Sequence, residues 1–588
     1  SYRWTYTGDQ LLYLQDKGGD ENWRIYLVNL DDDSVRDLTP LEGVRAEIEQ
    51  VSYKHPERIL IGLNDRDEQL HDVYELDLRT GARELVQENP GFAGFLIDDN
   101  YTVRFGVSLT PDGGQEMVKK TDDGWEEFLS IGMEDALTTS AIGFDKDGDT
   151  LYMLDSRGRD TAAFKTFDIA SGESTLIAED DRADLSDLMM HPTEKTPQAV
   201  AFNYLRKRWK ILDPAVEADL EELRKVADGE IEVTSRTLDD RMWVVVFVVD
   251  DGPVQYYLYN RDTKEARFLF TNRPELEGQP LVNMTPVLIE ARDGLKMVSY
   301  LTLPPGSDPD ADGVPAAPVP MVLNVHGGPW ARDTWGYDPE HQWLANRGYA
   351  VLSVNFRGST GFGKAFLNAG AKEWGAKMQD DLTDAVRWAV DRGIAQEDKV
   401  AIYGGSYGGY AVLAGLTFTP ELYAAGVDIV GPSNLVTLLE SIPPYWAPVK
   451  AVFTTRVGDP ETEEGRALLE ERSPLNHVEK IERPLLIAQG ANDPRVKQAE
   501  SDQIVEAMEE KAIPVTYTLF PDEGHGFARP ENRLAFYAVA EAFLAEVLGG
   551  RFEDVGDDFE GASITVPHGV GFVPGLEAAM TSATPSEE

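Results

Sequence analysis

The chain has 588 residues, more than one hydrophobic core normally serves, so its length predicts two to four domains. Its composition is globular, with 42% hydrophobic and 10% aromatic residues, and no uncharged apolar run is long enough to span a membrane. The absence of cysteine excludes disulfides, thiolate metal sites and a thiol nucleophile, and it fits a reducing, cytoplasmic compartment. The formal net charge of -50 argues against nucleic acid or an anionic membrane as partner; it indicates either simple solubility or adaptation to a salty cytoplasm.

The first half of the sequence repeats itself. Apolar strand cores recur about every 42–50 residues, which is the period of β-propeller blades, in the runs LLYL, ILIGL, YTVRFGV, TLYML, AVAF and MWVVVFVV. Most units continue with a second strand, a turn rich in Asp, Gly or Asn, and a third strand, as antiparallel blades require. The pattern predicts an all-β propeller over residues 1–283 with about six visible blades. Because the sequence starts within a strand-like rhythm, we expect a seventh blade in the full chain.

The rhythm changes after residue 283. Near-continuous apolar strands alternate with amphipathic helices, for example MVLNVHG, KVAIYGG and PLLIAQG with DDLTDAVRWAVDRG between them. This alternation predicts a mostly parallel sheet covered by helices on both faces, over residues 284–550. Residues 551–588 are acidic and weakly patterned, and we expect a peripheral extension that ends in a frayed tail.

A serine among glycines ends one of these strands. Residues 404–408 read GGSYG, which fits G-x-S-x-G, and a helix-like run follows Ser406. In a nucleophile elbow the serine occupies a strained turn, and the residues two positions away must lack a Cβ so that strand and helix can approach. The turn also directs the N–H of Tyr407 toward a developing oxyanion. The strand–turn–helix context predicts a nucleophilic serine rather than a plain glycine turn.

A serine hydroxyl needs a base, and on this kind of sheet the expected order along the chain is Ser, Asp or Glu, then His. Three histidines follow Ser406, namely His477, His525 and His568. His525, in FPDEGHGF, lies between a strand and the last long helix, where it can hang over the carboxyl edge of the sheet. His477 has no strand before it, and His568 is in the acidic extension. We therefore predict His525 as the base.

The acid that orients this histidine should also follow a strand. Asp493 ends the run PLLIAQGAND, in which a strand leads into a loop, and is predicted to hold one nitrogen of His525, so that the other nitrogen faces Ser406. Asp459, in RVGDPE, is the alternative acid, although no clear strand precedes it. A second oxyanion donor is expected from the glycine-rich run NVHGGPW, where we assign the N–H of Gly328.

These motifs together resemble the prolyl oligopeptidase family of serine peptidases, most closely its acylaminoacyl-peptidase and dipeptidyl-peptidase-like bacterial branch. The resemblance rests on HGGPW at 326–330, NFRGSTGFG at 355–363, GGSYGGY at 404–410, GANDPRV at 490–496, DEGHGF at 522–527 and QDKGGDENWRIY at 15–26. It implies that Ser406, Asp493 and His525 form the triad and that the backbones of Tyr407 and Gly328 form the oxyanion hole. It also implies a propeller that caps the active site and admits only short or unfolded peptides, and a possible homo-oligomer.

Two features concern substrate binding. The apolar stretch 434–453 is a candidate specificity pocket with Tyr445 and Trp446 as walls, although an ordinary core segment would look similar. Dipeptidyl peptidases hold the free amine with paired glutamates, and this chain has no clear match. Glu21 in GDENW is one candidate, with a solvated turn as the alternative. Glu126 and Glu127 are adjacent in a strand, and alternation should point them to opposite faces.

We therefore predict a serine peptidase built of an all-β propeller followed by an α/β-hydrolase domain. It should hydrolyse short peptides through an acyl-enzyme and need no cofactor and no metal. An exopeptidase of acylaminoacyl- or dipeptidyl-peptidase type is favoured. A carboxylesterase with the same triad is the alternative, and a binding scaffold with an inactive hydrolase domain is disfavoured by the intact Ser/Asp/His set.

Overall fold

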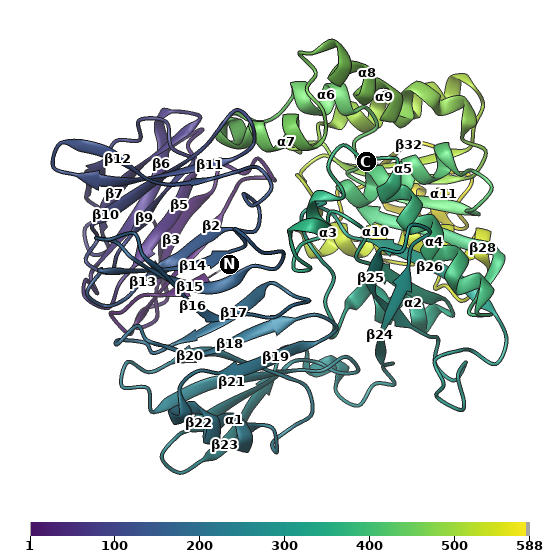
Figure 1. The fold of residues 1–588 in the computed structure, drawn as a ribbon. Helices are drawn as coiled ribbons and strands as arrows, with labels where there is room; N and C mark the ends of the chain where they lie inside the picture. The colour runs from purple at the N-terminus through teal and green to yellow at the C-terminus, as the bar shows by residue number, and fades with distance from the viewer. Residues whose placement is uncertain (1, 584–588) are drawn as a thin grey trace.

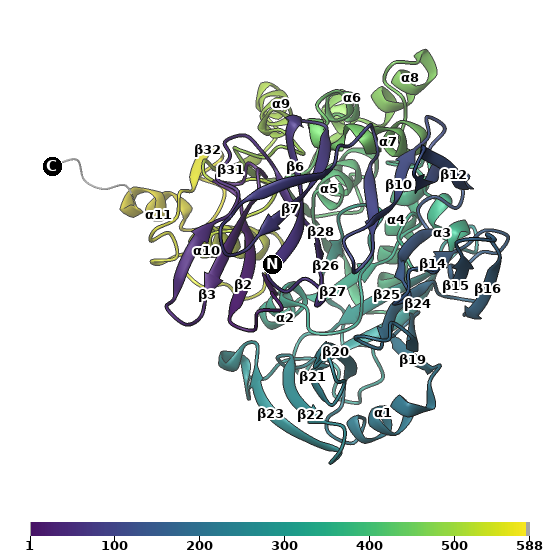
Figure 2. The same ribbon diagram turned by 90° about the vertical axis from the view of Figure 1, so that its left-hand side faces the viewer.

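The computed structural model describes residues 2–583 (Figure 1). Six small antiparallel sheets form the N-terminal part, and one nine-stranded sheet with its helices forms the C-terminal part. In Figure 2 the small sheets face the viewer and are arranged radially, with the large sheet behind them. The predicted β-propeller followed by an α/β-hydrolase domain is thus confirmed, with six blades in the described part of the chain.

Each blade is a meander whose strands pair in chain order. The first three blades are built from β1 (Tyr2–Trp4), β2 (Gln10–Gln15), β3 (Arg24–Asn29), β4 (Ser34–Asp37), β5 (Ala46–Val51), β6 (Arg58–Asp67), β7 (Leu70–Asp77), β8 (Arg83–Gln87), β9 (Gly94–Ile97), β10 (Val103–Leu109), β11 (Gln115–Thr121) and β12 (Gly124–Ile131). The next three contain β13 (Ser140–Phe144), β14 (Thr150–Asp155), β15 (Ala163–Asp168), β16 (Ser174–Ala178), β17 (Leu185–Met190), β18 (Pro197–Asn203), β19 (Lys207–Ile211), β20 (Glu230–Arg236), β21 (Met242–Val248), β22 (Gln255–Asn260) and β23 (Glu265–Thr271).

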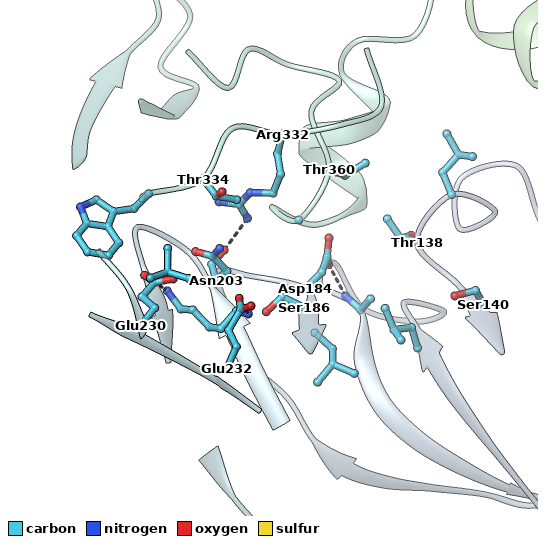
Figure 3. A pocket seen from close by; sticks show the side chains of 18 residues that line it. Thr138, Ser140, Asp184, Ser186, Asn203, Glu230, Glu232, Arg332, Thr334 and Thr360 are labelled. Carbon is cyan, nitrogen blue, oxygen red and sulfur yellow. Dashed lines mark hydrogen bonds and ion pairs between the residues drawn. The ribbon is translucent and has the colours of Figure 1, made fainter. Parts of the chain in front are cut away.

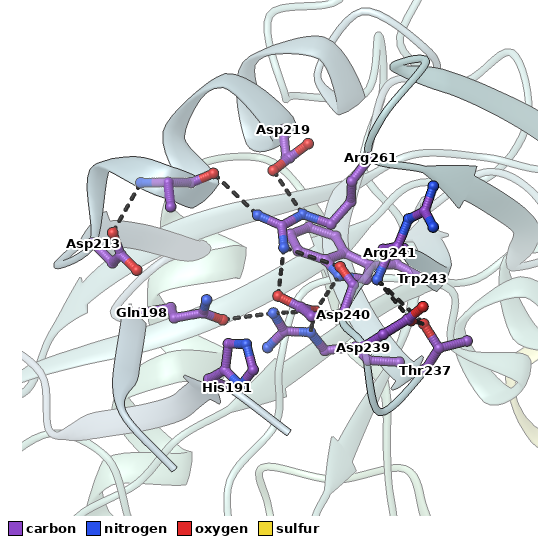
Figure 4. Close-up of polar contacts among 12 residues, drawn as sticks. His191, Gln198, Asp213, Asp219, Thr237, Asp239, Asp240, Arg241, Trp243 and Arg261 are labelled. Atoms are coloured by element: carbon purple, nitrogen blue, oxygen red, sulfur yellow. Dashed lines mark hydrogen bonds and ion pairs between the residues drawn. The ribbon is translucent and has the colours of Figure 1, made fainter. Parts of the chain in front are cut away.

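The fifth blade has three strands, and a short helical segment follows it. That segment consists of η1 (Pro214–Val216) and α1 (Glu217–Leu223), which bury Val216 and Leu220 in the same cluster as Trp243. A buried polar network joins this region to the sixth blade (Figure 4). Arg236 bonds to Asp240 and reaches Gln198 of the fifth blade at 2.5 Å. Two blades are therefore connected by charge-assisted hydrogen bonds as well as by apolar packing.

The large sheet has the order β24-β25-β27-β26-β28-β29-β30-β31-β32, with parallel pairing from β27 through β31. Its strands are β24 (Met284–Glu290), β25 (Lys296–Thr302), β26 (Val319–Val325), β27 (Ala350–Val354), β28 (Ala395–Gly405), β29 (Ala425–Ile429), β30 (Leu485–Gly490), β31 (Val515–Phe520) and β32 (Thr565–His568). Successive residues of the central strands serve opposite faces: Leu323 and Ile402 pack in one core, and Val322 and Ala401 in the other. This explains why these strands are apolar along their whole length.

Helices cover both faces. One core includes residues of α4 (Lys377–Asp391), α5 (Tyr407–Phe418) and α9 (Gln498–Glu510), and the other includes residues of α2 (Pro339–Arg347), α10 (Pro530–Leu548) and α11 (Leu576–Ala583). The remaining helical segments are η2 (Pro274–Leu276), α3 (Lys364–Asn368), α6 (Leu435–Glu440), η3 (Pro444–Val449), α7 (Lys450–Arg456), α8 (Glu463–Arg472) and η4 (Pro474–Lys480). No helix among residues 2–583 combines the length and apolarity needed to cross a membrane.

The segment after residue 550 contributes to the hydrolase domain. β32 adds an antiparallel edge strand beside β31, and Leu576 of α11 is fully buried in one of the two cores. The acidic stretch that we expected to be peripheral therefore packs as part of the sheet and its helical layer. The predicted frayed tail, 584–588, lies outside the described residues.

Loops of the propeller lie directly against the loops of the hydrolase domain. Asn492 donates to the carbonyl of Gly18 at 2.7 Å, and Lys364 pairs with Asp135 at 2.7 Å. A Cβ on Gly19 would come within 2.1 Å of the Gly524 nitrogen, so the two backbones are in close contact there. Blade 1 therefore supports the loop that carries His525.

Candidate active site

Ser406 occupies the sharp turn between β28 and α5. Its backbone is left-handed, with φ of 58° and ψ of -118°, a strained conformation for a residue with a side chain. A Cβ on Gly408 would come within 2.1 Å of the Val325 carbonyl oxygen, and one on Gly404 within 2.7 Å of the same atom. The glycines are thus needed because strand β26 passes directly beneath the turn.

The structure brings Ser406, His525 and Asp493 into one hydrogen-bonded line. The Nε2 of His525 lies 3.0 Å from the Ser406 Oγ, and its Nδ1 lies 2.7 Å from the Asp493 Oδ2. The other oxygen of Asp493 accepts the N–H groups of Arg495 and Val496 at 2.8 and 3.0 Å. The carboxylate is therefore fixed on both oxygens, and this arrangement can move a proton from the serine to the imidazole.

The other candidates for acid and base lie elsewhere. Asp459 accepts the N–H of Glu461 in the turn before α8. His477 contacts the carbonyl of Glu471, and His568 pairs with Glu509. None of these three contacts involves Ser406, His525 or Asp493.

The glycine loop after β26 borders the same pocket as the serine. Gly328 and Tyr407 line this pocket together with Ser406 and His525. The loop is held by His326, whose Nδ1 lies 2.8 Å from the Gly327 oxygen and whose Nε2 lies 2.9 Å from the Ser359 Oγ. Burial lowers the pKa of His326 to about 4. Its ring is therefore neutral, and Nδ1 donates to the Gly327 carbonyl. The Ser359 hydroxyl contacts both Nε2 and the Phe356 carbonyl oxygen, at 2.9 and 2.7 Å. Sequence reasoning missed this support of the loop.

An apolar pocket of about 280 Å³ adjoins Ser406. Its walls include Trp330, Trp374, Leu438, Trp446 and Phe453, and Trp446 stacks on Phe453 with ring centroids 5.7 Å apart. Trp446 thus lies where we expected a pocket wall, whereas Tyr445 does not line this pocket. A cavity of this size and character can take an apolar or aromatic side chain.

Tyr445 instead contacts Glu21, which reaches the site from the loop between β2 and β3. The Tyr445 hydroxyl donates to the Glu21 Oε2 at 2.7 Å, and Arg495 forms an ion pair with the Glu21 Oε1 at 2.7 Å. Arg45 pairs with the same carboxylate at 3.3 Å. Glu21 is 6% exposed and has a left-handed φ of 55°. It is not the solvated turn residue that was the alternative.

The electrostatics keep Glu21 ionised. Burial by itself would raise the pKa of this carboxyl, but the Tyr445 hydroxyl and the charges of Arg495 and Arg45 outweigh burial and hold the pKa below its usual value. Because Arg495 also lines the serine pocket, one residue separates that pocket from the carboxylate.

The paired glutamates of the third blade lie away from this site. Glu126 and Glu127 are exposed on β12, the outer strand of its sheet, and neither lines the serine pocket. They pair with the successive residues Lys119 and Val118 of β11, and the register shift of this pairing falls beyond them, between Glu127 and Leu129. Arg357 is buried and joins Asp293 to Asp381 by ion pairs at 2.9 and 2.7 Å.

Comparison with known proteins agrees with this geometry. The model of the prolyl oligopeptidase family matches residues 335–551. Dipeptidyl aminopeptidase BIII of Pseudoxanthomonas mexicana is 56% identical over 586 residues, covering 99% of this chain and 85% of that protein. Dipeptidyl peptidase family member 6 of Caenorhabditis elegans is 40% identical over 582 residues, covering 94% and 79%.

Among solved structures, a puromycin hydrolase superposes with a TM-score of 0.72 at 20% identity, covering 93% of this chain and 85% of that one. At this identity the likeness shows the shared fold alone. The similarity along nearly the whole chain shows the family: this protein belongs to the prolyl oligopeptidase family and is a serine peptidase.

Proposed function

We propose that the chain is a dipeptidyl aminopeptidase, which removes dipeptides from the free N-terminus of oligopeptides. The observation that carries the proposal is the buried, ionised carboxylate of Glu21, one residue behind the wall of the serine pocket. Two residues of extended peptide span about 7 Å, and in this proposal a substrate amine held near Glu21 leaves the second carbonyl at Ser406. The two dipeptidyl peptidases similar to this chain support the same specificity.

In the proposed reaction Ser406 attacks the carbonyl of the second residue while His525 takes its proton. Asp493 holds the imidazole by Nδ1 and stabilises the imidazolium that forms. The N–H groups of Tyr407 and Gly328 stabilise the oxyanion, and each such donor contributes about 3–4 kcal/mol. His525 then protonates the leaving amine, and water hydrolyses the acyl-enzyme.

The side chain of the second substrate residue would occupy the apolar pocket beside Trp446. This pocket favours apolar or aromatic residues, because their burial removes apolar surface from water. Tyr445 acts indirectly in this proposal, since its hydroxyl orients Glu21. Cytoplasmic location and homo-oligomer formation are also proposals, and cell fractionation and sedimentation would test them.

The variant Glu21→Gln tests the amine site. We expect KM for a dipeptide p-nitroanilide with a free amine to rise about tenfold or more, because a charge-assisted contact is lost. Hydrolysis of the N-acetylated dipeptide anilide should change little. Glu47→Gln is the matched control, because Glu47 also pairs with Arg45, at 3.0 Å, but forms no ion pair with Arg495. Equal KM values for wild type and Glu21→Gln, with the fold intact, would refute the amine site.

A further inference from the structure

A second and larger cavity lies between the propeller and the hydrolase domain. Its volume is about 470 Å³, within the range of small-ligand sites. Figure 3 shows the propeller strands on one side and the loops of Arg332 and Thr360 on the other. Neither Ser406 nor His525 lines it. The cavity is therefore separate from the apolar pocket of the nucleophile.

The walls of this cavity carry more hydrogen-bond acceptors than free donors. Three carboxylates, Asp184, Glu230 and Glu232, face two cations, Lys207 and Arg332. Lys207 already pairs with Glu232 at 2.7 Å and with Asp187 at 3.2 Å.

Arg332 is committed as well. It donates to the main-chain oxygens of Asn203 and Tyr204 at 2.6 and 3.1 Å and lies over the ring of Phe362. Both cations are thus committed, and what the charged groups of the cavity leave unused is acceptor capacity.

Asn203 provides an independent sign of a missing donor. The residue is 6% exposed, and its side-chain Oδ1 has no hydrogen-bond partner among the described residues. Buried carbonyl oxygens are nearly always paired, because leaving one unpaired is destabilising. A donor brought in by a ligand would satisfy this oxygen.

The carboxylates point to a ligand of positive charge. Burial raises the pKa of Asp184, and the neighbouring charge of Asp160 raises it further. Burial likewise raises the pKa of Glu230, although Lys207 and Arg206 oppose this. A cation in the cavity would compensate these carboxylates.

The loop that follows β26 connects the two cavities. Gly328 and Trp330 line the serine pocket, and Arg332 and Thr334 line the second cavity. Glu21 contacts Arg495 at another part of the serine pocket wall. A peptide whose amine lies near Glu21 would therefore extend its residues beyond the cleaved bond along this loop.

We propose that the second cavity is a subsite for a lysine or arginine side chain in the leaving part of the peptide, with its cationic group on Asn203, Glu230 and Glu232. This inference rests on the proposed function, because it requires a peptide whose N-terminus is at Glu21. It makes the enzyme selective on both sides of the cleaved bond.

Matched peptides test the subsite. The peptides share their first two residues and carry lysine, norleucine or glutamate at position three, four or five in turn. We expect kcat/KM at one of these positions to favour lysine over norleucine by about tenfold, the effect of one charge-assisted hydrogen bond. Glutamate at that position should be the poorest.

Two variants assign the effect to the cavity. Glu232→Gln and Asn203→Leu should each reduce the preference for lysine to about twofold or less. Neither should alter hydrolysis of a dipeptide p-nitroanilide, which has nothing in the cavity. Glu265→Gln is the control. Glu265 is exposed on β23, in the same blade as Glu232, and this variant should keep the full preference for lysine. Asp184 is avoided because it accepts the N–H groups of Ala162 and Gly363.

Equal cleavage of the lysine and norleucine peptides at all three positions, with the dipeptide anilide still hydrolysed, would overturn the subsite and leave the proposed function intact. Failure of wild type to hydrolyse any free dipeptide anilide would overturn the proposed function, and the subsite with it.

Discussion

The variant Asp493→Asn should abolish most of the peptidase activity, because it changes which nitrogen of the neutral His525 imidazole carries the proton. In the structure one oxygen of Asp493 accepts two main-chain N–H groups, and the other faces the Nδ1 of His525 at 2.7 Å. An asparagine must turn its carbonyl oxygen toward those N–H groups, because its NH₂ group would be a third donor there. The NH₂ group then faces Nδ1 and forces that nitrogen to accept.

The proton of the neutral imidazole moves to Nε2, which lies 3.0 Å from the Ser406 Oγ. His525 can then no longer take the serine proton. The loss expected for such a tautomer change is about 10⁴-fold in kcat, equivalent to about 5 kcal/mol of transition-state stabilisation.

The assay is hydrolysis of a dipeptide p-nitroanilide, with melting temperature as the check on folding. Asp459→Asn is the matched control and should keep wild-type activity, because Asp459 caps a turn before α8. A folded Asp493→Asn protein that loses less than tenfold in kcat would refute the reasoning.

Three further predictions concern the pocket, buried histidine and surface charge. Trp446→Ala should lower kcat/KM for substrates with an aromatic second residue by about tenfold or more, because apolar contact is lost. Substrates with alanine as their second residue should be affected little, and an equal effect on both kinds of substrate would contradict the pocket assignment. Burial lowers the pKa of His341 to about 4 in the folded protein. As pH drops from about 6.5 to 4, the imidazole is therefore protonated in the unfolded chain before it is protonated in the folded one, and the free energy of unfolding decreases. The stability of wild type relative to His341→Gln should therefore fall by about 3 kcal/mol over that range in denaturant titrations, and a constant difference would argue against a neutral buried ring. If the net charge of -50 reflects salt adaptation, melting temperature should rise between low and molar KCl, and a flat response would remove that idea.

Much of the site could be predicted because its signals are local in sequence. The glycines around Ser406 are required by the close passage of β26, and this requirement leaves the G-x-S-x-G pattern. His525 and Asp493 each follow a strand of the parallel sheet, so the topology alone brings them to one edge. Trp446 could be placed near the pocket because it lies in the apolar stretch that follows the elbow.

The rest depends on contacts between segments far apart in the chain. The packing of Gly19 on Gly524 and the ion pair of Glu21 with Arg495 join blade 1 to the hydrolase loops, and no local pattern marks either. The same holds for the cavity of Asn203, whose walls come from three blades and two loops. The acidic segment that carries β32 has weak alternation, since an edge strand buries only part of its surface.

The most direct test of the central claim is to identify the products released from an unmodified oligopeptide by mass spectrometry. The account predicts that wild type removes successive dipeptides from the free N-terminus and cuts the N-acetylated form of the same peptide far more slowly. The Ser406→Ala variant should release no dipeptides. Release of an acetylated amino acid or cleavage at internal bonds would contradict the dipeptidyl assignment, and unchanged hydrolysis by Ser406→Ala would contradict the catalytic site itself.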